Sequence, residues 1–203
     1  MPDIKSLFVT KLYRAELAEA AAFNADLARA CRAIAEDDEA GRAWSRAQGY
    51  KGYTSYASLN DLPKRDPTFA ALKKALDFHA KAFGEALHFE LGARKLALDS
   101  LWINVLEPGG VHTGHVHPHC ALSGTYYVEI PAGASALKLE DPRLPLMMAA
   151  PMRREDAPEA ELSFVYVAPR AGEVLMWESY LRHEVPLNAA RKPRVSVSFN
   201  YRW

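Results

Sequence analysis

Residues 112–128 read HTGHVHPHCALSGTYYV, and this stretch decides how the rest of the chain is interpreted. Four of the seven histidines fall within eight residues here: His112, His115, His117 and His119. Residues two apart on an extended chain point to the same side, so His115 and His117 can bind one metal ion together. Imidazole suits iron, zinc, copper and nickel, so the cluster predicts a metal site without choosing the metal. The alternative is a solvated, histidine-rich turn that binds no metal.

A third ligand is expected from a distant strand, because a site that holds an ion from three directions needs a second element. His183 is the candidate, since it follows the run 173–178 (EVLMWE), which is typical of a strand. His119 is a reserve ligand, because Pro118 is expected to turn the chain and redirect it.

The last run, 194–202 (RVSVSFNYR), alternates between apolar and polar residues. One face of the expected strand carries Val195, Val197, Phe199 and Tyr201, and the other carries Arg194, Ser196, Ser198 and Asn200. A guanidinium and a hydroxyl on the same face, at Arg194 and Ser196, predict a receptor for a carboxylate.

The first half of the chain has a helical pattern and the second half a strand pattern. Helices are predicted over 14–36 and 67–90, the second with Asp66 as its N-cap, Pro67 at its first position and Gly92 as its stop. Strands are predicted over 98–107, 123–130, 135–140, 163–168, 173–178 and 194–202. We therefore expect one α+β domain over 1–203, with 1–95 mainly helical and 96–203 forming an antiparallel sandwich or barrel.

Composition excludes several classes of protein. Lys plus Arg and Asp plus Glu both number 25, and this zero net charge argues against a nucleic-acid or membrane-surface partner. The chain shows neither an apolar run of about 18 residues nor a secretory signal. Its two cysteines, Cys31 and Cys120, are expected in a reducing cytoplasm.

Residues 141–162 form a long connection that contains four prolines and three methionines. Connections are typically about 4–6 residues long, so we expect a functional loop, namely a lid over the barrel mouth. The alternative is that the loop packs on the outside of the barrel or in a homodimer interface.

The motifs resemble those of a bacterial family of 2-oxoglutarate/iron(II) oxygenases. The pattern HxHP…LSGxYYV is present at 115–118 and 122–128. The resemblance continues through Pro169, Gly172, His183, Val185-Pro186, Asn188, Arg194 and Ser198-Phe199-Asn200. It covers most of residues 49–203, whereas the first 48 residues are only loosely similar.

The resemblance implies a double-stranded β-helix, also called a jelly roll and cupin-like, with N-terminal helices buttressing one side. It implies Fe(II) held by His115, His117 and His183, with 2-oxoglutarate as co-substrate and O₂ as oxidant. Arg194 and Ser196 match the residues that bind the distal carboxylate of 2-oxoglutarate. Tyr127 resembles a tyrosine that shares this carboxylate in prolyl hydroxylase-like enzymes, and a core aromatic is the equal alternative.

Two asparagines complete the expected site. Asn104 and Asn200 lie on strands expected to line the barrel, where they hold the co-substrate or satisfy buried backbone. One departure from the superfamily pattern is His117, which stands where an Asp or Glu is usual.

Two other functions compete with this reading. A cupin-type metal-dependent dioxygenase or isomerase fits Gly109 followed by His115 and His117, but it requires a glutamate where Ala121 and Leu122 stand. A non-catalytic metal- or ligand-binding barrel is the third reading. For an enzyme, a small-molecule or peptide substrate is expected.

Overall fold

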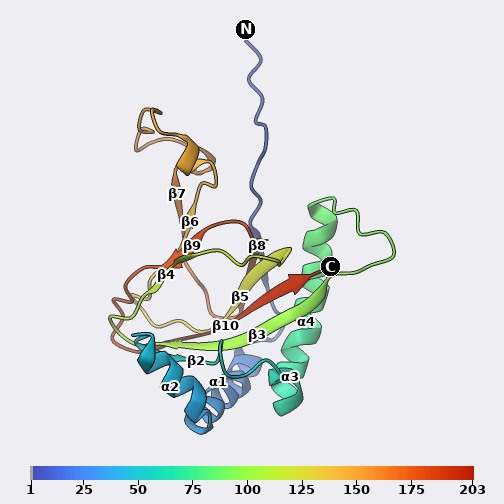
Figure 1. Ribbon diagram of the computed structural model, residues 1–203, viewed down its shortest axis with the longest axis vertical. Coiled ribbons are helices and arrows are strands. Elements are labelled where there is room, and N and C mark those ends of the chain that lie inside the picture. Colours follow the sequence, from blue (N-terminus) through green and yellow to red (C-terminus); the bar gives the residue numbers. More distant parts are fainter. Residues whose placement is uncertain (1) are drawn as a thin grey trace.

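Two antiparallel sheets with helices packed on one of them make up the computed structural model, which describes residues 2–203 (Figure 1). The helices are α1 (Ala20–Asp37), α2 (Glu39–Ala47), α3 (Leu62–Arg65) and α4 (Pro67–Ala86), with short 3₁₀ turns at Leu144–Leu146 and Glu159–Glu161. The strands are β1 (Tyr13–Glu16), β2 (Gly52–Thr54), β3 (Ala97–Leu106), β4 (His112–His115), β5 (Leu122–Glu129), β6 (Leu137–Glu140), β7 (Phe164–Val167), β8 (Glu173–Glu178), β9 (His183–Val185) and β10 (Arg194–Arg202).

The chain alternates between the two sheets as it runs. The six-stranded sheet has the order β1-β8-β5-β10-β3-β2, and the four-stranded sheet has the order β4-β9-β6-β7. From β3 onward each strand lies in the other sheet from the one before it, except at the β6–β7 hairpin. This mixed fold with alternating antiparallel strands is consistent with the expected jelly-roll core.

Two apolar clusters fill the spaces on either side of the six-stranded sheet. The first cluster joins α1 and α4 to the outer face of the sheet, through residues such as Leu27, Leu72 and Val197. The second cluster lies between the two sheets and includes Tyr127 and Trp177. Burying one large apolar side chain contributes about 1.5–3 kcal/mol, so the first cluster holds the helices firmly on the sheet.

Strand β10 confirms the predicted alternation. Its apolar face, Val195, Val197, Phe199 and Tyr201, is at most 1% exposed and belongs to the first cluster. Its polar face is also largely buried, and it points to the space between the sheets, where Arg194, Ser196 and Ser198 line a cavity. A strand with two buried faces thus joins the helical side of the molecule to its interior.

The helix predicted over 14–36 was wrong at its start. Residues Tyr13–Glu16 form β1, which pairs with β8, and the helix begins only at Ala20. Arg14 on β1 forms an ion pair with Glu173, which is 1% exposed. Sheet hydrogen bonds and this partly buried ion pair therefore override the helix propensity of the local sequence.

The second predicted helix is confirmed at its start and is shorter at its end. Asp66 accepts a hydrogen bond from the backbone N–H of Thr68 at 2.7 Å, and Pro67 opens α4. The helix ends at Ala86, and Gly92 follows in a turn with a φ of 59°. The six predicted strands are all present, with ends shifted by no more than two residues.

Short elements escaped the sequence patterns. Strands β1, β2, β4 and β9 were not predicted, since three or four residues of strand carry too little periodicity. Helices α2 and α3 were not predicted either. Strands β1 and β2 come from the part expected to be mainly helical, and they form the two edges of the six-stranded sheet. Across residues 2–203, none of the helices has the length and apolarity needed to span a membrane.

Replacing the N-cap of α4 should destabilise the fold. We expect Asp66→Ala to lower the free energy of unfolding by about 1 kcal/mol, because the Thr68 amide loses its acceptor. Asp66→Asn is the matched control and should change stability little, since asparagine caps as well as aspartate. Urea denaturation of the three proteins measures the difference, and equal losses in both variants would contradict the capping role.

Candidate metal centre

Three histidines meet in the space between the sheets. His115 ends β4, His117 follows it, and His183 begins β9. Strands β4 and β9 pair with His115 directly opposite His183. The ligand nitrogens of the three side chains lie within 4.8 Å of one another. The structure therefore brings together the three histidines that the sequence selected.

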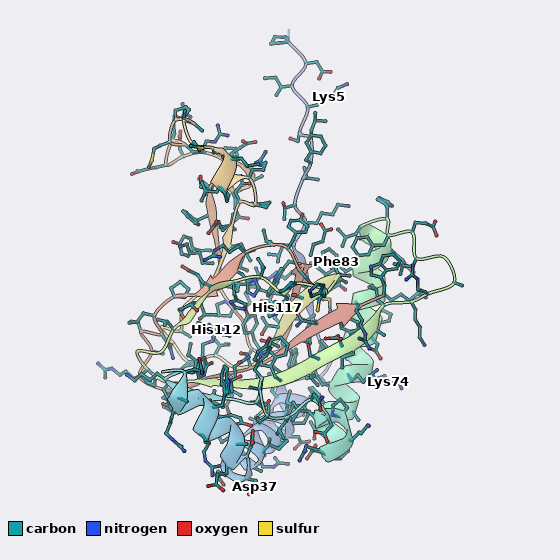
Figure 2. All side chains as sticks on the ribbon, viewed as in Figure 1. Lys5, Asp37, Lys74, Phe83, His112 and His117 are labelled. Atoms are coloured by element: carbon teal, nitrogen blue, oxygen red, sulfur yellow. The ribbon has the colours of Figure 1, made fainter. Side chains whose placement is uncertain are left out.

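The other histidines of the cluster take different places. His119 lies in an exposed turn with a φ of 68°, and it is not part of the three-histidine group. His112 stacks on His115 with 4.7 Å between ring centroids. Figure 2 labels His112 and His117, which lie on the side of β3 and β10 away from α1.

Backbone carbonyls orient two of the three imidazoles. The Nδ1 atom of His115 lies 2.7 Å from the carbonyl oxygen of Thr113, and the Nδ1 atom of His183 lies 2.9 Å from that of Leu181. A carbonyl oxygen accepts, so each Nδ1 carries the hydrogen and each Nε2 keeps a free lone pair. This is the tautomer that binds a metal through Nε2.

Burial keeps these imidazoles neutral. Desolvation, assisted by the charges of neighbouring histidines, lowers the pKa of His117 to about 4 and that of His183 to about 3. Burial also lowers the pKa of His112 to about 4, and it lowers the pKa of His115. Neutral imidazole is the form that binds a metal ion, so the three histidines suit a divalent cation at physiological pH.

A cavity beside the histidines contains most of the predicted co-substrate residues. Arg194 and Ser196 project into it from β10, and Ser196 is paired with Asn104 on β3 and with Tyr127 on β5. The complete lining is Tyr50, Trp102, Asn104, Leu106, His112, His115, His117, Gly124, Thr125, Tyr127, Leu137, Trp177, His183, Val185, Arg194, Ser196 and Ser198. Asn200 is not in this lining and lies behind His117 instead.

Arg194 is a buried cation without an anion. It is 3% exposed, and its Nη1 donates to the carbonyl of Ser135 at 3.0 Å. Among the ion pairs of residues 2–203, none involves Arg194. A buried charge is costly unless it is paired, so this guanidinium suits an anionic ligand in the cavity.

The neighbouring tyrosine supports the same reading. The Arg194 guanidinium lies 5.4 Å from the ring centre of Tyr127, which is fully buried. The Tyr127 hydroxyl has no hydrogen-bond partner within the described chain. Burial raises the pKa of Tyr127 to about 12, so the hydroxyl stays a neutral donor for a carboxylate.

Asn104 differs from Tyr127 because its amide already has partners. Its Oδ1 accepts from Thr54 and its Nδ2 donates to Ser198, both at 3.0 Å. Its position in the cavity is as expected, but these contacts leave little of its hydrogen-bonding capacity for a ligand.

Sequence reasoning missed several lining residues, among them His112 and Trp177. His112 and His115 are three apart and would point to opposite faces of a regular strand. An irregularity in the β4–β9 pairing between them places both imidazoles side by side. Trp177 lies 4.7 Å from His183 between ring centroids, and its buried indole N–H has no partner among the described residues.

The expected lid does not cover the cavity. No residue of 141–162 belongs to the described lining. The segment, orange in Figure 1, projects beyond the ends of β6 and β7 and away from the sheets. Leu146, Met148 and Met152 in it are each more than 80% exposed.

A comparison with protein families gives a match that includes the residues of this site. A family model described as "Putative 2OG-Fe(II) oxygenase" matches residues 100–200, which include the three histidines and Arg194. The comparison with curated proteins gave no match.

Solved structures share the fold. The non-heme alpha-ketoglutarate-dependent epimerase SnoN from nogalamycin biosynthesis has a TM-score of 0.65 and 15% identity, covering 94% of this chain and 78% of its own. A Pseudomonas putida prolyl-4-hydroxylase has a TM-score of 0.57 and 16% identity, covering 94% and 91%. HygX from Streptomyces hygroscopicus has a TM-score of 0.59 and 12% identity, covering 95% and 82%.

Removal of one of the three histidines should abolish metal binding. We expect one divalent ion per chain, with nitrogen–metal distances of about 2.0–2.3 Å by X-ray absorption. His183→Ala should lose the ion after dialysis, because two imidazoles remain. The matched control is His119→Ala, which removes an exposed histidine outside the group. Loss of the ion from the control variant, or its retention in His183→Ala, would contradict the assignment.

The lowered pKa values predict how the stability of the metal-free protein depends on pH. In the unfolded chain these histidines titrate near their ordinary value of about 6.5, whereas in the fold His117 and His183 stay neutral to about pH 4 and 3. The unfolded state therefore binds more protons as the pH falls below about 6.5, and folding stability should fall through this range.

Denaturation midpoints between about pH 7.5 and pH 4.5 test this expectation. The double variant with His112→Gln and His183→Gln should show a shallower loss, because two of the titrating groups are gone. An equal slope in the double variant and the wild type would show that carboxyl groups, not these histidines, set the pH dependence.

Proposed function

Because the chain belongs to the family of 2OG-Fe(II) oxygenases, we propose that it oxidises a small-molecule or peptide substrate by using the cavity described above. Fe(II) binds through His115, His117 and His183. Arg194 binds the distal carboxylate of 2-oxoglutarate. The observation that carries this proposal is the buried, unpaired Arg194 in the same cavity as three neutral imidazoles.

The donors of the cavity fit the chemistry of 2-oxoglutarate. This molecule has a carboxylate at each end and a keto oxygen beside one of them. Arg194 supplies a charge-assisted donor for the far carboxylate, and the hydroxyls of Tyr127 and Ser196 are its neighbours. The near carboxylate and the keto oxygen would then face the three histidines, which would hold the metal ion.

When bound, iron and 2-oxoglutarate would supply the oxidising power: one oxygen atom of O₂ would enter succinate, with release of CO₂, and the other would oxidise the substrate. The residues of the chain bind, orient and exclude water. Trp102, Trp177 and Leu137 give the cavity apolar walls that keep bulk water from the metal site. No acid–base residue is required, and the described lining contains no Asp or Glu.

His117 makes the centre more positive than a site with one carboxylate ligand. A neutral imidazole leaves the full double charge of the ion uncompensated, and Arg194 adds another positive charge. Both charges favour a dianionic co-substrate. The third histidine is therefore compatible with the use of 2-oxoglutarate.

The proposal also covers the type of β-fold, the number of domains and the location of the protein. The alternating strands from β3 to β10 form a double-stranded β-helix, and α1 and α4 buttress its six-stranded sheet. We treat 1–203 as one domain, since the first apolar cluster combines both halves of the chain. The two free cysteines, Cys31 and Cys120, support a reducing cytoplasm as its location.

Loss of Arg194 should weaken co-substrate binding and spare the metal. We expect Arg194→Ala to lower 2-oxoglutarate affinity roughly tenfold to a hundredfold, as one charge-assisted hydrogen bond contributes about 1.5–3 kcal/mol. Calorimetry on anaerobic, iron-loaded protein measures it, and Arg191→Ala removes an exposed arginine three residues away as the control. Unchanged affinity in Arg194→Ala would assign Arg194 another role.

Turnover separates an enzyme from a binding protein. Iron-dependent formation of succinate from 2-oxoglutarate is expected even without the prime substrate, at a slow uncoupled rate, when ascorbate is supplied as the two-electron reductant in place of the substrate. Absence of succinate from protein that binds both iron and 2-oxoglutarate would favour a non-catalytic barrel.

A further inference from the structure

The tautomer of His117 is set differently from that of the other two histidines. His115 and His183 each direct Nδ1 at a backbone carbonyl, which can only accept. The Nδ1 atom of His117 instead lies 3.4 Å from the Nδ2 atom of the Asn200 side-chain amide. An amide has one end that donates and one that accepts, so Asn200 can support either tautomer of His117.

The orientation of the Asn200 amide selects the tautomer of His117, and the tautomer decides whether His117 can bind a metal. With Nδ1 against Asn200, Nε2 is the nitrogen left to join the other two histidines. If the amide presents its NH₂ group, Nδ1 must accept and the ring hydrogen sits on Nε2, which then has no lone pair. If the amide presents its oxygen, Nδ1 donates and Nε2 is free to bind.

The surroundings of Asn200 allow the second arrangement. Its Oδ1 lies 2.7 Å from the hydroxyl of Ser123, and its Nδ2 lies 3.1 Å from the hydroxyl of Ser100. Hydroxyls donate or accept, and the N and O atoms of an amide are assigned from such contacts. Turning the amide by half a rotation therefore keeps both hydrogen bonds and directs Oδ1 at His117.

A second serine completes the chain of hydrogen bonds. The Ser123 hydroxyl lies 2.8 Å from that of Ser179, so it can accept from the turned amide and donate onward. The backbone carbonyl of Ser179 accepts from the backbone N–H of His117 at 3.2 Å. Ser179 thus contacts Ser123 through its hydroxyl and His117 through its backbone carbonyl.

We propose that Asn200 is a positioning residue for the metal centre: its side-chain oxygen accepts Nδ1–H of His117, and Ser123 and Ser179 hold the amide in that orientation. Asn200 is 4% exposed and is not among the residues that line the cavity, so it acts on the metal through His117. The inference rests on the three-histidine metal site of the proposed function, but not on the use of 2-oxoglutarate.

The role follows from the chemistry of position 117. A carboxylate ligand has no tautomers, whereas an imidazole binds only if its second nitrogen holds the hydrogen. A hydrogen-bond acceptor at Nδ1 therefore favours the metal-binding form of a histidine at this position. Outer partners of this kind typically contribute tenfold to a hundredfold to metal affinity.

Cobalt(II) binding by chelator competition tests the proposal without co-substrate or turnover. We expect Asn200→Ala to lower cobalt affinity roughly tenfold to a hundredfold. Asn200→Asp should bind at least as tightly as the wild type, because both carboxylate oxygens accept. Asn24→Ala is the matched control, since Asn24 is also a buried asparagine with two partners, Tyr126 and Val128, and none of these three residues lines the cavity.

The tautomer itself can be measured on the metal-free wild type. Nitrogen-15 shifts of the His117 ring should show hydrogen on Nδ1, a result that needs no variant to fold. Hydrogen on Nε2, or an Asn200→Ala protein that binds cobalt as tightly as the wild type, would overturn the inference. A wild-type protein that binds no cobalt would overturn the metal site of the proposed function as well.

Discussion

The central strand β10 must satisfy two different interiors at once, and the rest of the structure depends on this constraint. One face packs on the helices through Val197 and Phe199, and the other supplies Arg194 and Ser196 to the cavity. Side chains alternate along a strand, so a shift of the register by one residue would exchange the two faces. Such a shift would bury the Arg194 guanidinium among apolar side chains and remove Arg194 and Ser196 from the cavity. The core and the site are thus fixed by one register, which β3 and β5 impose from both sides.

The charges of the cavity also connect the binding of the metal ion with the binding of the co-substrate. Arg194 is buried without a carboxylate partner in the described chain, and the cavity lining has no acidic residue to balance a metal ion. With a divalent ion bound by the three histidines, positive charge would lie at both ends of the cavity. A dianion that spans the two ends neutralises both, whereas a monoanion leaves one end unbalanced. The co-substrate then acts as the counter-ion that the protein itself does not provide.

The sequence predicted the parts of this arrangement that depend on periodicity or on chain order. The alternation in 194–202 placed Arg194 and Ser196 on one face, and the step of two between His115 and His117 indicated a shared ion. The sequence could not predict the place of His112, because an irregularity in the β4–β9 pairing overrides simple alternation. It also assigned Asn200 to the cavity, since a strand pattern gives the face of a residue but not which neighbour fills the space in front of it. Short strands such as β1 were missed because their pairing with β8, not their own residues, makes them strands.

The segment between β8 and β9 shows why a third ligand so far along the chain can be placed accurately. Ser179 accepts from the backbone of His117, and Leu181 accepts from the ring of His183. These two carbonyls lie two residues apart on one short connection, so they fix two ligands relative to each other. Pairing of His115 with His183 across β4 and β9 then fixes the third. Backbone contacts therefore position most of the proposed metal site, and the side chain of Asn200 contacts Nδ1 of His117, the one imidazole of the three whose tautomer no described backbone carbonyl sets.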